Sequence, residues 1–276
     1  MLGMKLIRLL GQAAVVWFRR DADVHAAALA YFVPFAITPL LLLSITLVGF
    51  IIGGAEVSAL LVRWGNTLDP EITALLDTSV RNFSILTTAY YIPVLAIVFF
   101  SAMVLLALNS LGAGLHKIWG IEARGARNWL CRSGRSIIFV LTLQVYLVAI
   151  ILLNRTIVFI AHLPFGHVLE LLYPALLFVG TLLLFTVGYG LLPISAPSLR
   201  ARFYGAIVAS SLFLFTRTLV TIHAAASPIP DLFGAAGLVI VMLIWIYVSA
   251  SIIFYGAAFA VVYEETKQKI KTKVIA

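Results

Sequence analysis

Charged residues are scarce in this chain. Only 11% of its 276 residues are Asp, Glu, Lys or Arg, whereas 63% are hydrophobic. The mean hydropathy of +1.10 is too high for a soluble domain, whose surface must be polar. Soluble and disordered classes are therefore excluded. We predict a polytopic membrane protein in which residues 1–276 form a single domain.

Cysteine and clustered acidic residues are also lacking. Cys131 is the single cysteine, which excludes an internal disulfide and a multi-cysteine metal site. The 11 acidic residues are scattered, whereas a two-metal nuclease needs several carboxylates around ions ~4 Å apart. Zinc-protease, nucleophile-elbow and Walker motifs are missing, and His162 and His167 are most simply loop histidines. We expect no enzyme activity, no metal and no cofactor.

Long apolar runs are abundant. A helix rises 1.5 Å per residue, so about 20 apolar residues cross a hydrocarbon layer ~30 Å thick. Spans of this length must be helical, because backbone groups in lipid have to be hydrogen-bonded within the chain. We predict an all-α protein with six transmembrane helices, at residues 29–54, 89–111, 136–154, 171–192, 203–224 and 235–262.

Basic residues are distributed unevenly across these spans. Fifteen of the 19 Lys and Arg residues fall on one side, and three fall on the other. By the positive-inside rule, both termini are cytoplasmic. Residues 1–28 then form an interfacial segment, and residues 263–276 form a basic tail. The net charge of +8 is explained by topology and by contact with anionic lipids, so we expect no nucleic-acid partner.

Two segments outside the spans have the pattern of amphipathic helices. Residues 5–20 place basic and apolar residues on opposite faces, which is typical of a helix lying on the inner leaflet. In the outer loop at residues 55–88, Asp69 and Pro70 are a good helix start. We expect a short amphipathic helix there, packed on the outer surface of the bundle.

Arg217 is the most informative residue inside a span. It lies 14 residues into the fifth span, ~21 Å from its cytoplasmic end, where a cation must face the bundle or a wet cavity. Arg155 lies near the outer end of the third span, and His223 follows Arg217 by six residues. These residues predict an outward-opening cavity for an anionic headgroup or a small anion. Equally, Arg217 could lock helices together by pairing with Asp231, Glu170 or Glu56.

Polar and helix-breaking residues complete the candidate site. Gln144 and Asn109 could line the cavity, although hydrogen bonding between helices is the simpler interpretation of each. Pro34 and Pro39 fall in the first span, where they remove backbone donors and kink the helix. We predict a hinge at these prolines, as in transporters with broken helices.

Seven short motifs and the pair Gly256-Ala257 form a recognisable set along the chain: Ala26-Ala27-Ala28-Leu29-Ala30-Tyr31, Pro39-Leu40-Leu41-Leu42, Leu108-Asn109, Ile118-Trp119-Gly120, Tyr204-Gly205-Ala206, Phe233-Gly234-Ala235 and Trp245-Ile246-Tyr247. As a set they resemble the motifs of the YihY/virulence factor BrkB family. The resemblance covers about residues 20–265 and implies a six-helix bacterial inner-membrane protein with cytoplasmic termini. Some family members carry the label ribonuclease BN, regarded as mistaken, and others are linked to serum resistance. This chain departs from the family in having Gly256-Ala257-Ala258 where many members resemble Gly-Ala-Glu.

Two functional hypotheses follow. The leading one is a transporter or flippase-like protein that handles an anionic lipid or a small anionic substrate. The alternative is a non-catalytic envelope-integrity or assembly factor with a dry, packed bundle. A membrane ribonuclease is the weakest hypothesis, because no catalytic constellation is present.

Overall fold

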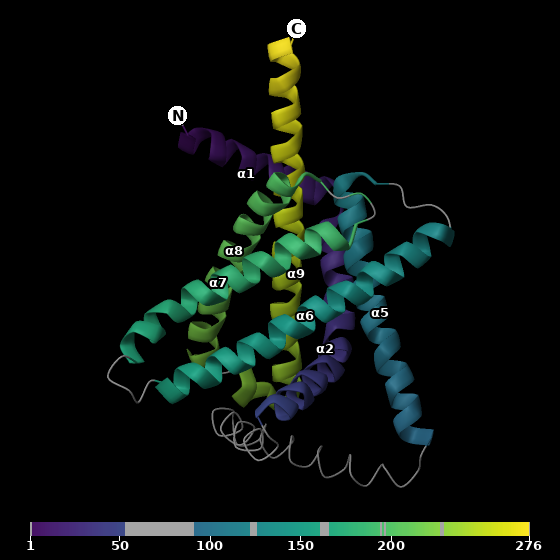
Figure 1. Ribbon diagram of the computed structural model, residues 1–276, viewed down its shortest axis with the longest axis vertical. Helices are drawn as coiled ribbons and strands as arrows, with labels where there is room; N and C mark the ends of the chain where they lie inside the picture. Colours follow the sequence, from purple (N-terminus) through teal and green to yellow (C-terminus); the bar gives the residue numbers. More distant parts are fainter. Residues whose placement is uncertain are drawn as a thin grey trace.

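The computed structural model describes residues 2–52, 91–121, 126–160, 166–193, 195, 197–226 and 229–275. Every regular element in these ranges is an α-helix, which confirms the all-α class. The predicted outer amphipathic helix and the side chains of His162 and His167 lie outside the described residues. The helices, shown in Figure 1, are α1 (Leu2–Arg19), α2 (Ala22–Ile52), α5 (Tyr91–Trp119), α6 (Ala126–Ile160), α7 (Gly166–Leu191), α8 (Leu199–Ala226) and α9 (Ile229–Ile275).

Five of these helices are long and apolar enough to cross a membrane, which confirms an integral membrane protein. They are α5 to α9, and their apolar stretches overlap the last five predicted spans. At 31 residues, α2 is long enough for a sixth crossing. Its described apolar stretch, Ala22–Ile37, is shorter than a full span. The sixth crossing therefore stays a prediction.

Helix α9 is the central element of the bundle. It packs against α1, α2, α5 and α8, and in Figure 1 it runs through the middle of the molecule, with its C-terminal end projecting past α1. Side chains of other helices hydrogen-bond to its backbone. The Tyr189 hydroxyl donates to the carbonyl of Ile253 at 2.6 Å, and the Trp119 indole donates to that of Ala257 at 3.3 Å. These bonds fix α5 and α7 against α9.

The crossing of α8 and α9 is built from small residues. Close approach of two helices in a membrane requires small side chains at the contact, because packing replaces the hydrophobic effect as the driving force. The fully buried small residues at this crossing include Ala209 and Ala260. Gly205 and Gly256 lie between them and face each other.

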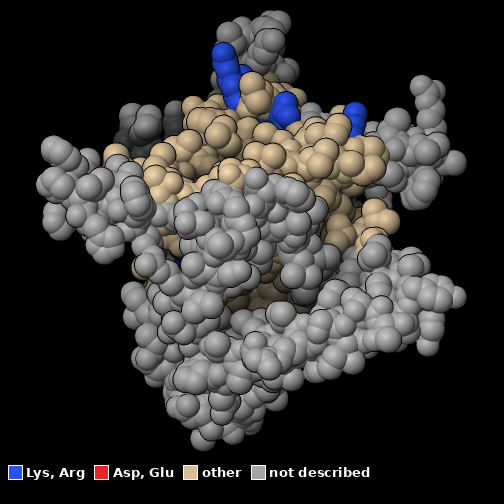
Figure 2. Space-filling model, turned by 60° about the horizontal axis from the view of Figure 1, so that its bottom comes forward, with Lys and Arg blue, Asp and Glu red and all other residues tan. Residues whose placement is uncertain are grey.

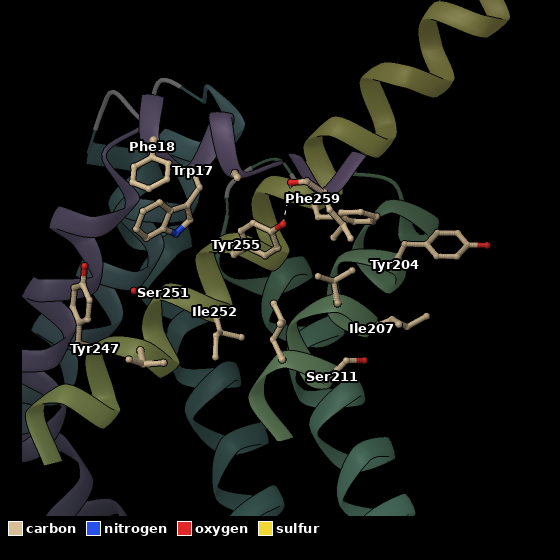
Figure 3. Close-up of a pocket in the computed structure, with 15 residues that line it drawn as sticks. Trp17, Phe18, Tyr204, Ile207, Ser211, Tyr247, Ser251, Ile252, Tyr255 and Phe259 are labelled. Carbon is tan, nitrogen blue, oxygen red and sulfur yellow. Dashed lines mark hydrogen bonds between the residues drawn. The ribbon is translucent and has the colours of Figure 1, made fainter. Parts of the chain in front are cut away.

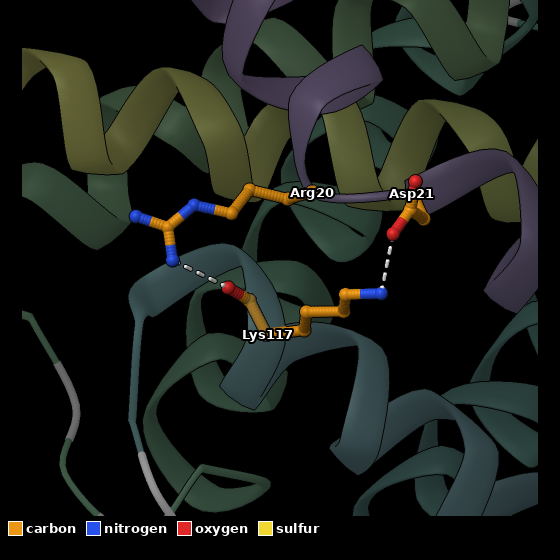
Figure 4. A network of polar contacts seen from close by, with 3 residues as sticks. All are labelled: Arg20, Asp21 and Lys117. Atoms are coloured by element: carbon orange, nitrogen blue, oxygen red, sulfur yellow. Dashed lines mark hydrogen bonds and ion pairs between the residues drawn. The ribbon is translucent and has the colours of Figure 1, made fainter.

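A polar network holds the corner between α1 and α2. Asp21 adopts a φ of 49°, which turns the chain sharply after α1. The Lys117 ammonium at the end of α5 lies 2.6 Å from the Asp21 carboxylate, and Arg20 donates to the Lys117 carbonyl at 3.1 Å (Figure 4). The start of the bundle is thereby tied to the end of α5.

The predicted N-terminal helix is confirmed as α1, but part of its predicted membrane face contacts protein. Ala13 is fully buried, and Trp17 packs against the core. The exposed apolar stripe consists instead of Ile7, Val15 and Phe18, with exposed fractions of 70%, 49% and 70%. Hence one apolar face of α1 packs on the bundle, and a second apolar face is exposed on the surface of the protein.

Candidate functional site

An apolar groove of about 830 Å³ runs between α1, α8 and α9. This volume is in the upper part of the range of small-molecule sites. Figure 3 shows Trp17 and Phe18 on one side, Tyr204 and Ile207 on the other, and Tyr255 between them. The described lining residues are Leu10, Ala14, Trp17, Phe18, Tyr204, Ile207, Val208, Ser211, Leu212, Tyr247, Val248, Ser251, Ile252, Tyr255 and Phe259.

The floor of the groove follows one face of α9. Tyr247, Ser251, Tyr255 and Phe259 recur every four residues, so their side chains project from the same side of the helix. Residues 204–212 of α8 form the facing wall. Both stretches belong to helices that are long and apolar enough to span a membrane. The groove therefore lies along membrane-spanning segments rather than in an extramembrane domain.

Hydrogen-bonding groups in the groove are few and uncharged. The Tyr255 hydroxyl donates to the Leu10 carbonyl at 2.9 Å, which ties α1 to α9. Trp17 Nε1 and Ser251 Oγ are buried and have no hydrogen-bond partner among the described residues. None of the described lining residues carries a charge. The groove thus suits an apolar ligand with a neutral hydrogen-bond acceptor.

Gln144 joins α6 to α2. Its side chain is 4% exposed, and Nε2 donates to Ser44 Oγ at 2.6 Å and to the Leu40 carbonyl at 3.3 Å. Ser44 in turn donates to the Leu40 carbonyl at 2.8 Å. These contacts are the interhelical hydrogen bonds favoured by the sequence. Whether Gln144 also contacts a substrate stays a prediction.

Arg217 lies on the exposed surface of α8, close enough to Tyr146 of α6 to interact with it electrostatically. The Tyr146 hydroxyl lies 2.9 Å from Thr181 Oγ1, and Thr181 donates to the Leu177 carbonyl at 2.7 Å. Since Thr181 uses its proton there, Tyr146 is the donor in the first bond. The Tyr146 oxygen is therefore oriented by α7 and remains an acceptor.

The groove and Arg217 are on different faces of α8. Arg217 follows the lining residue Val208 by nine residues, which is two and a half helical turns and places it half a turn away. None of the five predicted binding residues is among the described residues that line the groove. The predicted anion cavity and the groove are thus separate places.

The remaining predicted residues are placed only in part. Asn109 is half-buried on α5, whereas the side chains of Arg155, His223 and Pro39 lie outside the described residues. Helix α2 is continuous from Ala22 to Ile52 through Pro34, and in Figure 1 its lower part turns away from its upper part. The direction change fits the predicted kink, and the hinge role stays a prediction.

Sequence reasoning missed the groove residues. The predicted site was built on charged and amide side chains, whereas the groove is lined by apolar, aromatic and hydroxyl side chains. Within the described ranges, no group of three His, Cys, Asp or Glu could hold a metal ion. One signal was available: hydroxyl and aromatic side chains recur every four residues from Tyr247 to Phe259. That spacing places polar atoms on one face of a span, where lipid alone would favour aliphatic residues.

Comparison with known proteins places the chain in a family. The family model described as virulence factor BrkB matches residues 14–274. A UPF0761 membrane protein from Alcanivorax borkumensis is 26% identical over 258 residues, which is 89% of this chain. The chain spans 58% of the length of that relative. No solved structure was found to match. With its helices and with a family match over nearly its whole length, the chain belongs to the BrkB virulence factor family of membrane proteins.

Proposed function

We propose that this protein handles membrane lipid, as a transporter or flippase-like factor rather than as an enzyme. The observation that carries the proposal is the uncharged groove between α1, α8 and α9. An apolar groove on membrane-spanning helices meets acyl chains before any other ligand. Its occupant is therefore a chain of the surrounding lipid.

The length of the groove matches one leaflet. From Tyr247 to Phe259 its floor covers twelve residues, or about 18 Å along α9. Half of a hydrocarbon layer is roughly 15 Å deep. The groove extends along α9 toward the end at which α1 packs. It thus receives chains from the leaflet on the α1 side.

Basic residues near the same end would attract anionic lipids to this surface of the protein. Arg8, Arg19, Arg20 and Arg200 are exposed. Figure 2 shows the Lys and Arg side chains gathered toward the upper edge of the visible face. Each basic residue near an anionic membrane surface contributes about 1 kcal/mol of attraction. By the positive-inside rule this end would be cytoplasmic. The similarity to a bacterial membrane protein supports the bacterial inner membrane as its location.

The predicted anion site around Arg217 and Arg155 belongs to the same proposal. Arg217 interacts electrostatically with Tyr146, and its guanidinium group is suited to an anionic oxygen. Arg217 faces away from the groove. A headgroup bound at Arg217 and an acyl chain bound in the groove would therefore lie on different faces of α8. Transport would need a path around that helix.

A specific observation also favours the alternative, an envelope-integrity factor that does not transport. The bond from Gln144 to Ser44 and the small residues at the α8–α9 crossing are features of a dry, packed bundle. Such a protein would hold lipid only at its surface. Groove-dependent lipid binding therefore distinguishes the two functions.

Native mass spectrometry of the mildly extracted protein tests the proposal. Ser211 is exposed and lines the groove, so Ser211→Trp should fill it with little disturbance of the core. Leu219, 50% exposed and about two turns further along α8, provides the control Leu219→Trp. We expect retained lipid in the wild type and in the control, and its loss in Ser211→Trp. Equal retention by all three proteins would contradict a groove-bound lipid.

A further inference from the structure

We infer, on the basis of the proposed lipid-binding function, that the groove selects an uncharged, ester-linked acyl lipid of the acylglycerol class. Trp17 and Ser251 would donate hydrogen bonds to its ester carbonyl oxygen. The anionic lipids that the basic end attracts would remain outside the groove.

Two buried donors without partners carry this inference. Trp17 Nε1 comes from α1 and Ser251 Oγ from α9, and neither has a hydrogen-bond partner among the described residues. Figure 3 shows the two side chains on the same side of the groove. Buried donors in native proteins are rarely unpaired, and unpaired ones call for a ligand, a water or an ion.

Ser251 is unusual for its own helix. A serine in a transmembrane helix commonly donates to the carbonyl four residues earlier. Ser249 does so, to Trp245 at 2.8 Å, and Thr266 does so, to Val262 at 2.8 Å. Ser251 makes no such bond in the described chain. Its hydroxyl turns about a single torsion with three staggered positions, so it can reach a ligand in the groove at little cost.

The missing partner is a neutral acceptor. Both groups can donate, and one carbonyl oxygen has two lone pairs and can accept from both. A phosphate or carboxylate would lose its hydration without gaining a cation, because no described lining residue is charged. A purely hydrocarbon chain would leave both donors unsatisfied, and an ether oxygen is a weaker acceptor than an ester carbonyl oxygen. An ester carbonyl fits both requirements.

Depth further excludes a charged headgroup. Ser251 lies about 18 Å from Val239, where the membrane-spanning stretch begins, and about 20 Å from Glu264, the first charged residue that follows it in α9. It is therefore well inside a hydrocarbon layer ~30 Å thick, below the plane of lipid headgroups. A lipid that brings its ester group to this depth must carry no charge above it. Acylglycerols meet this condition and phospholipids do not.

The test compares lipids that differ in one feature. Wild-type protein in detergent is offered a diacylglycerol, a dialkylglycerol with the same chains and ether links, and a phosphatidylglycerol, and retained lipid is read by native mass spectrometry. We expect roughly tenfold more diacylglycerol than dialkylglycerol, about the worth of one buried hydrogen bond. Trp17→Phe and Ser251→Ala should reduce that ratio, and Ser249→Ala, which removes a hydroxyl that is already bonded to the Trp245 carbonyl and is not among the groove residues, should not. Ser251→Ala removes one oxygen atom, so its result does not depend on how α1 packs.

Each other outcome overturns a defined statement. Equal retention of the ester and ether lipids, abolished by Ser211→Trp, would disprove ester recognition and leave lipid binding intact. Preferential, groove-dependent retention of phosphatidylglycerol would disprove selection of an uncharged lipid. If Ser211→Trp changes the retention of no lipid, the proposed function fails as well.

Discussion

Gly205 of α8 and Gly256 of α9 are in such close contact that neither position has room for a methyl group. A Cβ atom on Gly205 would lie 2.5 Å from the Gly256 carbonyl oxygen, and one on Gly256 would lie 2.7 Å from the Gly205 carbonyl oxygen. Both obstacles are backbone atoms, which cannot rotate away. This contact sets the distance between the two helices that form the groove.

Gly205→Ala should therefore destabilise the protein. Forcing a methyl group into a packed contact costs about 1–3 kcal/mol, because the helices must separate. Thermal unfolding in detergent measures the effect. Gly134→Ala on α6 is the control, since no atom lies within 4 Å of its added Cβ, and it should raise stability by about 0.5–1 kcal/mol because Ala favours the helix more than Gly does. Equal unfolding temperatures for the two variants would show that the α8–α9 contact is looser than described.

Asp21→Asn should weaken the corner between α1 and α2 in a pH-dependent way. The hydrogen bond and charge of Lys117 lower the pKa of Asp21 below that of an ordinary Asp. A lowered folded-state pKa stabilises the protein above the unfolded-state pKa, and this stabilisation is lost as the pH falls through the folded-state pKa. Wild type should thus be the more stable protein at pH 7, and the two should converge in acid. Asn tolerates the same left-handed backbone, so the comparison isolates the charge.

The outcome that contradicts this ion pair is a difference between wild type and Asp21→Asn that is the same at pH 7 and in acid. Both groups of the pair are exposed, so high salt should also reduce the difference at neutral pH.

Gln144→Leu should lower the stability of the protein and leave the amount of retained lipid unchanged. The substitution removes the bond between α6 and α2, worth ~0.6–2 kcal/mol in membrane proteins, and Ser44 keeps its own bond to Leu40. Unfolding temperature and retained lipid are measured on the same sample. Loss of lipid at unchanged stability would instead assign Gln144 to a substrate site.

Arg217→Gln should separate the two proposed lipid contacts. Since Arg217 lies on the face of α8 opposite the groove, its loss should abolish retention of an anionic ligand and leave groove-bound lipid unchanged. Ser211→Trp should have the reverse effect. If Arg217→Gln lowers the unfolding temperature and changes no ligand, its role is structural.

Helix positions followed from the sequence because the physical cause is local. A run of apolar residues in lipid has to satisfy its own backbone, and hydrogen bonds from each residue to the fourth preceding one do so without a partner segment. The helices α5 to α9 were accordingly predicted, although each extends a few residues beyond its apolar run. The helix α1 was predicted from another local signal, the separation of basic and apolar residues onto opposite helix faces.

The sequence did not predict which helices pack against one another, as Trp17 and Arg217 illustrate. The sequence places Trp17 on an apolar face of α1, and a membrane surface and a neighbouring helix satisfy that face equally well. It places Arg217 inside a span, and only the packing of α8 decides that Arg217 lies near Tyr146 and away from the groove.

Composition and hydrophobic period alone thus determined that this is an all-α membrane protein, because the rules for crossing lipid act on each segment separately. The groove was decided only by tertiary structure. Its three walls come from segments up to 249 positions apart, from Leu10 to Phe259. They meet because glycines let α8 and α9 touch and because Tyr255 holds α1 across them.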